Sequence, residues 1–353
     1  MADSKQAPLD SAAAAKAAFA SVQVKPFPDD IFTAPELRWA VIGCGVIANQ
    51  MAQSLALAGR KLAGVANRTL SKAQAFAEQY GIEKVYDTVE DLYADPDIDA
   101  IYITTPHNTH IAYLRAALAA GKHVLCEKAI TLNSAELDEA CAIADEHNVV
   151  LMDATTVLHM PLYQELRRRM DAGEFGRMNL AQLNFGSYKE YGDLTNRFYN
   201  RNLAGGAMLD IGVYALSVMR LAEVVSLGNT CETGVDVAGG IVCRNAEQQL
   251  GVVSLTLHSK QPKRSVISFD KCYIEVNEYP RADHATIVWT ADGHREEVHA
   301  GTEAYALCYE MADLEQAVAG DDSKRELLDY ASDVMELMTK LRADWGVVYP
   351  EEE

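Results

Sequence analysis

The sequence has few basic residues and no long apolar run, and both absences exclude classes of protein. Lysine and arginine total 31 against 51 aspartates and glutamates, so the 353-residue chain carries a formal charge of −20. A surface this acidic repels phosphate backbones and anionic lipid headgroups. No stretch approaches the roughly 20 apolar residues of a spanning helix. Nucleic acids and membranes are therefore not expected as partners.

Paired cysteine motifs are also absent. The 7 cysteines are scattered and form no Cys-x-x-Cys pair, which argues against a disulfide framework and against a zinc site. The alanine-rich run from Ala12 to Ala20 is interrupted by Lys16, which argues against a secretory signal. We expect reduced thiols, no bound metal and a cytoplasmic protein.

What is present is typical of a globular chain of two domains. Apolar residues make up 49% of the sequence, and single cores stop growing near roughly 250 to 300 residues. Pro26 and Pro28 favour extended chain over helix, so residues 1–36 are predicted to form an arm laid over another surface. We place the first domain at 37–155 and the second at 156–302, and we expect the helices and tail of 303–353 to pack back on both.

Short β-branched runs alternate with helical stretches in the first domain, which is the signature of parallel βαβ units. This alternation predicts an α/β domain with a doubly wound Rossmann sheet. Six strands are predicted, at Trp39–Ile42, Leu62–Ala66, Lys84–Tyr86, Ala100–Thr104, His123–Glu127 and Val149–Asp153.

The second domain is rich in segments of alternating polarity that follow one another closely. Such strands predict an α+β domain with a large, mostly antiparallel open sheet. They begin near Met178 and are clearest at Leu250–His258, Ser265–Phe269, Cys272–Val276, Thr286–Thr290 and Glu296–His299. Helices are predicted at Pro161–Ala172, Ala207–Ala222, Glu303–Ala319 and Lys324–Arg342.

A glycine-rich loop follows the first predicted strand. Residues 43–48 fit the Gly-x-Gly-x-x-Gly/Ala fingerprint of dinucleotide binding. Gly43 permits the tight turn, Gly45 lets the backbone approach a pyrophosphate, and Ala48 allows the helix to pack closely on the strand. The pyrophosphate would lie at the helix N-terminus beside Val46 and Ile47. The alternative is a purely structural tight turn.

The second predicted strand runs into Asn67, at the point where an acidic residue would accept hydrogen bonds from the adenosine ribose. No carboxylate repels a 2′-phosphate here, and Arg68 and Thr69 are available to pair with one. The sequence therefore favours NADP(H). NAD(H) is the alternative, with Arg68 only stacking on the adenine.

Three later segments carry a family resemblance. Residues 104–110 follow the fourth strand, residues 121–128 end in Glu-Lys after the fifth, and Gly205-Gly206 precedes Asp210 and Gly212. In this order they resemble the Gfo/Idh/MocA family, the relatives of glucose-fructose oxidoreductase and inositol dehydrogenase. The resemblance implies that one loop borders the nicotinamide, with Thr105, Pro106, His107 and His110.

The resemblance also implies that Lys128 lies beside the nicotinamide and moves the proton of the substrate hydroxyl, while Glu127 orients Lys128 or the nicotinamide ribose. A desolvated lysine beside a cofactor can have its pKa lowered toward the range of a working acid or base. The sequence departs from the family at Ala129, where the family has proline. A cis peptide before alanine costs about 2.5 to 4 kcal/mol, so we expect the backbone to differ there.

Asp210 and Tyr214 are four residues apart on a predicted helix and therefore share a face. The resemblance implies that Tyr214 donates a proton to the substrate carbonyl and that Asp210 holds the substrate or orients this network. The alternative is a buried tyrosine with a satisfied hydroxyl. The resemblance further implies substrate contacts from His159 and Arg197, although a structural role suits His159 equally well.

These features together predict an NADP(H)-dependent oxidoreductase that moves a hydride between nicotinamide and a secondary alcohol or ketone of a sugar, polyol or vicinal diol. Two alternatives stay open: an enzyme like glucose-fructose oxidoreductase that holds its cofactor tightly, and a non-catalytic dinucleotide-dependent regulator. The proton-transfer groups Lys128 and Tyr214 argue against the regulator. The resemblance also implies a homodimer or homotetramer formed through the free face of the second sheet.

Overall fold

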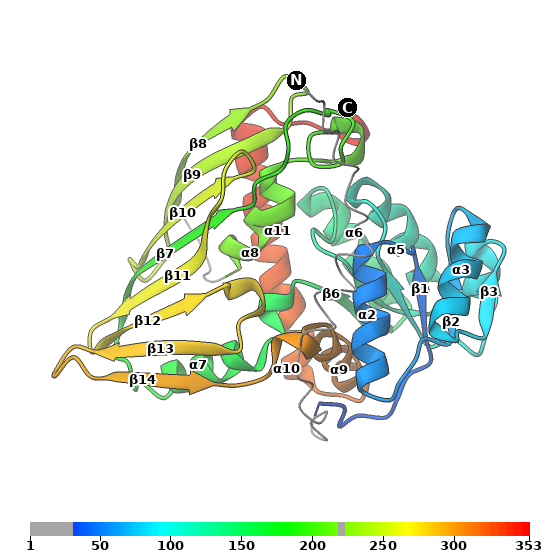
Figure 1. The fold of residues 1–353 in the computed structure, drawn as a ribbon, viewed down its shortest axis with the longest axis horizontal. Helices are drawn as coiled ribbons and strands as arrows, with labels where there is room; N and C mark the ends of the chain where they lie inside the picture. The colour runs from blue at the N-terminus through cyan, green and yellow to red at the C-terminus, as the bar shows by residue number, and fades with distance from the viewer. Residues whose placement is uncertain (1–30, 218–222) are drawn as a thin grey trace, which may run out of the picture.

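The computed structural model describes residues 31–217 and 223–353, which form two domains side by side (Figure 1). The first domain has a parallel sheet with helices on both faces, and the second has a large sheet with helices packed on one face. The predicted combination of a doubly wound α/β domain and an α+β domain with a mostly antiparallel sheet is confirmed.

The six-stranded sheet of the first domain has the order β3-β2-β1-β4-β5-β6, with every pair parallel. The order reverses between β1 and β4, and in such sheets ligands bind beyond the carboxyl ends of the strands at this point. The strands are β1 (Trp39–Ile42), β2 (Gly64–Ala66), β3 (Lys84–Tyr86), β4 (Ala100–Ile103), β5 (His123–Cys126) and β6 (Leu151–Asp153), within two residues of the predicted boundaries.

Strand β1 shows why this sheet is covered on both faces. Its four residues are all buried, because a strand packed on both sides needs apolar residues throughout. Trp39 and Val41 pack with α2 (Val46–Leu57), α3 (Leu70–Tyr80) and α9 (Ala306–Val318). Ala40 and Ile42 belong to the opposite layer, which contains α4 (Val89–Ala94), α5 (His110–Ala119) and α6 (Ser134–Glu146).

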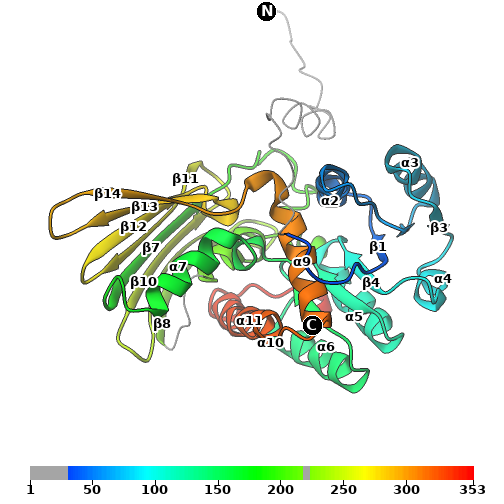
Figure 2. The ribbon, with the colours of Figure 1, turned by 90° about the horizontal axis from the view of Figure 1, so that it is seen from below.

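The eight-stranded sheet of the second domain has the order β14-β13-β12-β11-β7-β10-β9-β8. Only β7 and β10 pair in parallel, and the other neighbours are antiparallel. One face packs against α7 (Pro161–Asp171), α8 (Val213–Leu216) and α11 (Leu327–Asp344), and Figure 2 shows α7 and α11 on the same side of the sheet. The strands are β7 (Met178–Gly186), β8 (Glu223–Thr230), β9 (Asp236–Arg244), β10 (Leu250–Thr256), β11 (Gln261–Phe269), β12 (Cys272–Asn277), β13 (His284–Trp289) and β14 (Arg295–His299).

Strands β8 and β9 are not among the strands singled out from the sequence. Both contain glycines, which weaken a strand pattern unless something approaches the backbone closely. Here the indole of Trp345 lies on Gly228 and Gly239, where any side-chain carbon would overlap it. Its Nε1 atom donates a hydrogen bond to Ser226 Oγ at 3.0 Å. The two glycines therefore leave room for Trp345, and a contact with so distant a residue cannot be predicted from the local sequence.

The helix predicted at 207–222 differs from the structure. A five-residue π-helical segment (Met208–Gly212) leads into α8, and residues 218–222 lie outside the described ranges. The two C-terminal helices occur close to their predicted positions, as α9 after a short 3-10 turn at 303–305, and as α10 (Asp322–Arg325) followed by α11. Helix α9 packs on α2 and β5, and α11 packs on α6, β6 and α8.

Most of the predicted N-terminal arm, residues 1–30, lies outside the described residues. The remaining part begins at Ile31, whose side chain is buried in a cluster with Met160 and Tyr305. The hydroxyl of Thr33 accepts a hydrogen bond from Gln316 on α9 at 3.0 Å. Among the described residues, no helix is long and apolar enough to cross a membrane.

Candidate active site

A cavity of about 690 Å³ lies between the two domains, at the carboxyl ends of β1, β2, β4 and β5. Its first-domain wall is formed by the glycine loop, the Asn67 segment, the loop from Thr104 to Thr109, and the Glu127-Lys128 pair. The second domain contributes Arg197, Phe198, the segment around Asp210, and Arg281. The position matches the ligand-binding edge of an open α/β sheet.

The glycine loop has the geometry that a dinucleotide requires. Gly43 has φ +104°, and a Cβ there would lie 2.6 Å from the hydroxyl of Thr104. Gly45 faces open space, since a Cβ at this position would have no other atom within 4 Å. Helix α2 begins after Gly45 without a side-chain cap, so its first N–H groups are available to donate hydrogen bonds to a pyrophosphate. These residues fit a dinucleotide cofactor.

At the other end of this wall, Asn67 and Arg68 line the cavity together with Lys72. Arg68 and Lys72 are exposed, and the Asn67 side chain donates to the main-chain oxygen of Thr69 at 3.0 Å. Thr69 itself does not line the cavity. Lys72, in the first turn of α3, lines the cavity where Thr69 does not.

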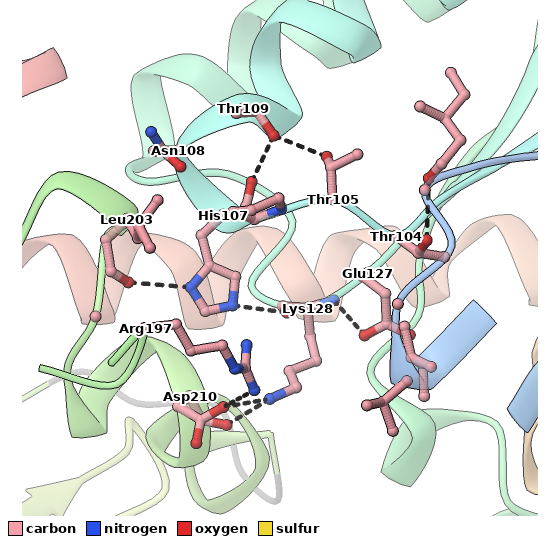
Figure 3. Close-up of a pocket in the computed structure, with 18 of the residues that line it drawn as sticks. Thr104, Thr105, His107, Asn108, Thr109, Glu127, Lys128, Arg197, Leu203 and Asp210 are labelled. Atoms are coloured by element: carbon pink, nitrogen blue, oxygen red, sulfur yellow. Dashed lines mark hydrogen bonds and ion pairs between the residues drawn. The ribbon is translucent and has the colours of Figure 1, made fainter. Parts of the chain in front are cut away.

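Lys128 and Asp210 meet across the cavity (Figure 3). The ammonium of Lys128 donates to the main-chain oxygen of Asp210 at 2.6 Å and lies 3.2 Å from Oδ1 of its carboxylate. Arg197 approaches the same Oδ1 atom at 3.7 Å. The Lys128 ammonium also lies 5.0 Å from the ring centroid of Tyr214. Lysine, aspartate and tyrosine thus form one cluster with contributions from both domains.

The backbone at Lys128 is held by two neighbours. Glu127 accepts a short hydrogen bond from the hydroxyl of Tyr102 and a bond of 3.3 Å from the N–H of Lys128. The main-chain oxygen of Lys128 lies 3.1 Å from Nε2 of His107. The peptide bond between Lys128 and Ala129 is cis, although we expected from the sequence that the backbone would avoid this geometry before alanine.

The charges of this cluster determine the pKa of Lys128, which we expected from the sequence to be lowered. Burial by itself lowers the pKa of Lys128, but the carboxylate of Asp210, with Tyr214 and Glu127, outweighs burial and raises this pKa above its usual value. Burial opposes ionisation of Asp210 as well, yet Lys128 and Arg197 lower the pKa of this carboxyl to about 2. Burial raises the pKa of Tyr214, and the nearby Lys128 lowers it in part. Lys128 is therefore a cation held by Asp210, and Tyr214 is a protonated hydroxyl.

A π-helical segment that contains Asp210 leads into α8, which carries Tyr214. Gly206 has φ +127°, and the carboxylate of Asp236 occupies the space where its side chain would lie. That carboxylate accepts from the N–H of Met208 at 2.6 Å and so caps the start of the turn. π-Helical segments of this kind are frequent at functional sites. The predicted sharing of one helix face is thus achieved with a wider turn than an α-helix provides.

Two predicted ligand residues are buried away from the cavity wall. Both ring nitrogens of His110 are engaged, by the main-chain oxygens of Ala129 at 3.0 Å and Thr105 at 2.8 Å. His159 lies between Asp313 Oδ2 and the main-chain oxygen of Asp153, both at 2.8 Å. Neither histidine lines the cavity. Both histidines thus belong to buried hydrogen-bond networks, and the contacts with cofactor and substrate expected of them stay predictions.

His107 does line the cavity and bridges the domains. Its Nδ1 atom lies 3.2 Å from the main-chain oxygen of Ala204 in the second domain. Burial, together with His110 and the charge of Lys128, lowers the pKa of His107 to about 3. A neutral imidazole carries one N–H and donates to only one of its two carbonyl neighbours.

The remaining predicted site residues line the cavity: Gly43, Gly45, Val46, Ile47, Asn67, Arg68, Thr105, Pro106, Glu127, Lys128, Arg197, Asp210 and Tyr214. Lys72 and Arg281 were not predicted from the sequence, since each stands outside any motif. Lys72 could have been found from its place in the first turn of the helix that follows Arg68. No local signal in the sequence marks Arg281. Within the described residues, no group of three metal-ligating side chains occurs.

A Rossmann sheet, an uncapped glycine loop and a lysine–tyrosine pair beside it define a dinucleotide-dependent oxidoreductase. Residues 37–155 match the family model described as an oxidoreductase family with an NAD-binding Rossmann fold, Gfo/Idh/MocA. Residues 163–275 match the C-terminal domain of the same family. The chain therefore belongs to the Gfo/Idh/MocA oxidoreductase family, as the motifs implied.

Among its relatives are two amphibian dehydrogenases. The chain is 30% identical over 251 residues to the trans-1,2-dihydrobenzene-1,2-diol dehydrogenase of Xenopus tropicalis, which covers 68% of this chain and 74% of the relative. With the Xenopus laevis enzyme of the same name, identity is 28% over 332 residues, which is 89% of this chain and 99% of the relative.

Solved structures share the whole fold. A 3-ketoreductase from Actinomadura kijaniata, in complex with NADP and TDP-benzene, aligns with a TM-score of 0.74 at 23% identity over 88% of this chain and 98% of its own. A levoglucosan dehydrogenase in complex with NADH and levoglucosan aligns with a TM-score of 0.75 at 19% identity over 86% and 97%. At these identities the likeness is one of fold alone.

Proposed function

We propose that this protein is an NADP(H)-dependent oxidoreductase that interconverts a secondary alcohol and a ketone on a sugar, polyol or vicinal diol. The observation that carries the proposal is the cluster of Lys128, Asp210 and Tyr214 in the same cavity as the uncapped glycine loop. A bound nicotinamide dinucleotide supplies the hydride chemistry. The chain's own residues supply the proton transfer and the orientation of the substrate.

Tyr214 is the proton donor in the direction of carbonyl reduction. Its hydroxyl is protonated at neutral pH because burial raises its pKa, and proton transfer to a developing alkoxide contributes about 10²- to 10⁴-fold in rate. The Lys128 ammonium, 5.0 Å from the tyrosine ring, stabilises the phenolate left behind. Asp210 fixes Lys128 in this position through the contacts of 2.6 and 3.2 Å.

The proposed preference for NADP(H) rests on the adenosine end of the cavity. Arg68 and Lys72 lie there, and Asn67 stands where a carboxylate would bind ribose hydroxyls. Two cations without a carboxylate favour a 2′-phosphate. The names of the relatives support a hydroxylated substrate, since two are dihydrodiol dehydrogenases.

A homodimer through the outer face of the large sheet is part of the proposal. Val225, Val242 and Val252 are paired in one row across β8, β9 and β10. On β8 the side chains of Val225 and Leu227 are 77% and 83% exposed. Contiguous exposed apolar groups of this kind mark protein interfaces.

Titration of the purified protein with NADPH and with NADH, followed by fluorescence, tests the cofactor assignment. We expect tighter binding of NADPH. Equal binding, or a preference for NADH, would mean that Asn67 serves the ribose hydroxyls and Arg68 only stacks. Binding of neither would favour a protein without dinucleotide chemistry, and cofactor that survives gel filtration would favour the tightly held arrangement.

A further inference from the structure

The wall of the cavity carries more cations than carboxyl groups, in a chain whose formal charge is −20. Five cationic side chains line it, from Arg68, Lys72, Lys128, Arg197 and Arg281, against the carboxyl groups of Glu127 and Asp210. Charge of one sign gathered in a cleft raises the local concentration of ligands of the opposite sign. The cavity is therefore a positive region within an acidic protein.

The cofactor accounts for only part of this surplus. Arg68 and Lys72 lie at the adenosine end, and the N-terminus of α2 is available to the pyrophosphate. Arg197 and Asp210 lie on the other side of Lys128 from Thr104 and the strands of the first domain (Figure 3). Under the proposed function this is the side on which a substrate would meet the nicotinamide, and the second domain supplies its charges.

Lys189 adds to the positive charge behind this wall. Its ammonium lies 4.0 Å from the ring centroid of Phe198, and the guanidinium of Arg197 lies 4.3 Å from the same centroid. Burial lowers the pKa of Lys189, Asp210 raises it, and the nearby cations Arg197 and Lys128 lower it further. Like charges that crowd around a single aspartate indicate a place for an additional anion.

Arg281 is the cation that the second sheet supplies to this wall. It ends a short turn (Tyr279–Arg281) between β12 and β13, and its NH1 atom donates to Gln50 on α2 at 3.2 Å. Among the described residues it forms no ion pair with a carboxylate. It lines the cavity close enough to Glu127 and Tyr214 to lower the pKa of both groups. A guanidinium presents a planar fork of donors that matches carboxylate and phosphate oxygens.

We propose that the substrate carries an anionic oxygen group beside the reacting alcohol, and that Arg281 binds this group with support from Arg197 and Lys189. The proposal rests on the proposed function of the same cavity and narrows its substrate to hydroxy acids, sugar acids or sugar phosphates. Arg281 also contacts α2 through Gln50, so the residue proposed to bind the anion bridges the second domain and the cofactor domain.

Binding of matched pairs by calorimetry tests this proposal. The protein is first saturated with NADP⁺ or NAD⁺, whichever binds more tightly. It is then titrated with propane-1,2-diol against lactate, sorbitol against gluconate, and sorbitol against sorbitol 6-phosphate. We expect at least one acid or phosphate to bind about tenfold or more tightly than its neutral partner, which is the scale of one charge-assisted hydrogen bond. The pair that shows the preference distinguishes carboxylate from phosphate.

The variant Arg281→Gln tests whether Arg281 is the residue that binds the anionic group. It should abolish most of this preference and change the affinity for the neutral partner and for the dinucleotide less than about twofold. Arg295→Gln is the matched control, since Arg295 is a half-exposed arginine paired with Glu275 on the edge of the large sheet. The control should keep the preference of the wild type.

Two outcomes overturn the proposal. One is that no anionic compound binds more tightly than its neutral partner. The other is that Arg281→Gln weakens dinucleotide binding and leaves the preference for the anion intact, which would make Arg281 a cofactor ligand. Because the assay measures binding without turnover, its result is independent of hydride transfer. A protein that binds gluconate through Arg281 but transfers no hydride would contradict the proposed function and support this inference.

Discussion

The ammonium of Lys128 touches Asp210 twice, at 2.6 Å from its main-chain oxygen and at 3.2 Å from its carboxylate. Lys128 follows the fifth strand of the first domain, and Asp210 lies in the π-helical turn of the second. Their side chains are 14% and 11% exposed, so little water competes for the contact. The pair joins the domains across the cavity and holds a cation beside Tyr214.

Tyr214→Phe should reduce kcat for carbonyl reduction by about 10²-fold or more, because the variant lacks the hydroxyl proton. The dissociation constant for NADPH should stay within about twofold, since the change leaves the glycine loop and Arg68 intact. Steady-state kinetics and a fluorescence titration measure the two quantities. Tyr330→Phe, on the C-terminal helix α11, is the control. Turnover by Tyr214→Phe at the wild-type rate would exclude this tyrosine as the proton donor.

Asp210→Asn should move the alkaline limb of the pH profile for carbonyl reduction to lower pH. The carboxylate of Asp210 raises the pKa of Lys128 against the effect of burial, so its removal lets the ammonium lose its proton at lower pH. Opposite charges at this distance shift a pKa by about 1 to 3 units, and a displacement of that order is expected in kcat/KM. Asp270→Asn is the control. An alkaline limb that stays in place in Asp210→Asn would show that the ionisation of Lys128 does not determine that limb.

Arg68→Ala and Lys72→Ala should each weaken NADPH binding by about tenfold, because each removes one cation from the 2′-phosphate. NADH binding should change by less than about twofold. Asn67→Asp should invert the preference, since a carboxylate repels the phosphate and accepts from ribose hydroxyls. Fluorescence titration with both cofactors measures these effects. Equal losses for NADPH and NADH would mean that the cations serve the adenine alone.

His107 should make the fold sensitive to mild acid. Its pKa is lowered to about 3 by burial, His110 and Lys128, against about 6.5 in an unfolded chain. The unfolded state therefore binds the proton first as the pH falls, and stability is full above pH 6.5 and declines toward pH 3. Between pH 7 and pH 5 this amounts to about 2 kcal/mol. Urea unfolding of His107→Gln should show a loss smaller by that amount, and an equal loss in both proteins would refute the assignment.

Leu227→Glu should convert a dimer into a monomer. Leu227 is 83% exposed on the outer face of β8, and a charge buried in an apolar interface without a partner opposes association. Light scattering measures the mass of both proteins, and Glu78→Ala, at an exposed position on α3 of the first domain, is the control. A monomeric wild-type protein would contradict the proposal that the outer face of the sheet is a dimer interface.

The first domain could be predicted almost completely from the sequence, because buried parallel strands read as short apolar runs and the glycine loop has a fixed spacing. β1 and β3 have the predicted boundaries. The second domain was harder. Gly228 and Gly239 lie under Trp345, a contact more than 100 residues away in the chain, and no local pattern encodes such a contact.

The sequence motifs predicted which residues line the cavity better than they predicted the properties of those side chains. Lys128 and Asp210 line the same cavity, yet the pKa of Lys128 is raised and not lowered, because the sequence does not reveal that Asp210 lies within hydrogen-bond distance. His110 and His159 belong to buried networks that only the packing discloses. Arg281 reaches the cavity from a turn of the second sheet, a position set by the tertiary fold.

The central claim is that Lys128 and Tyr214 move a proton while a dinucleotide carries a hydride, and one assay tests it most directly. NADP⁺ and the protein are incubated with a panel of vicinal diols, polyols, sugars and hydroxy acids, and the formation of NADPH is followed. The account predicts turnover of at least one compound by the wild type, and loss of that turnover in Lys128→Ala with NADPH affinity retained. A wild type that binds NADPH but turns over no compound would contradict it and favour a dinucleotide-dependent regulator.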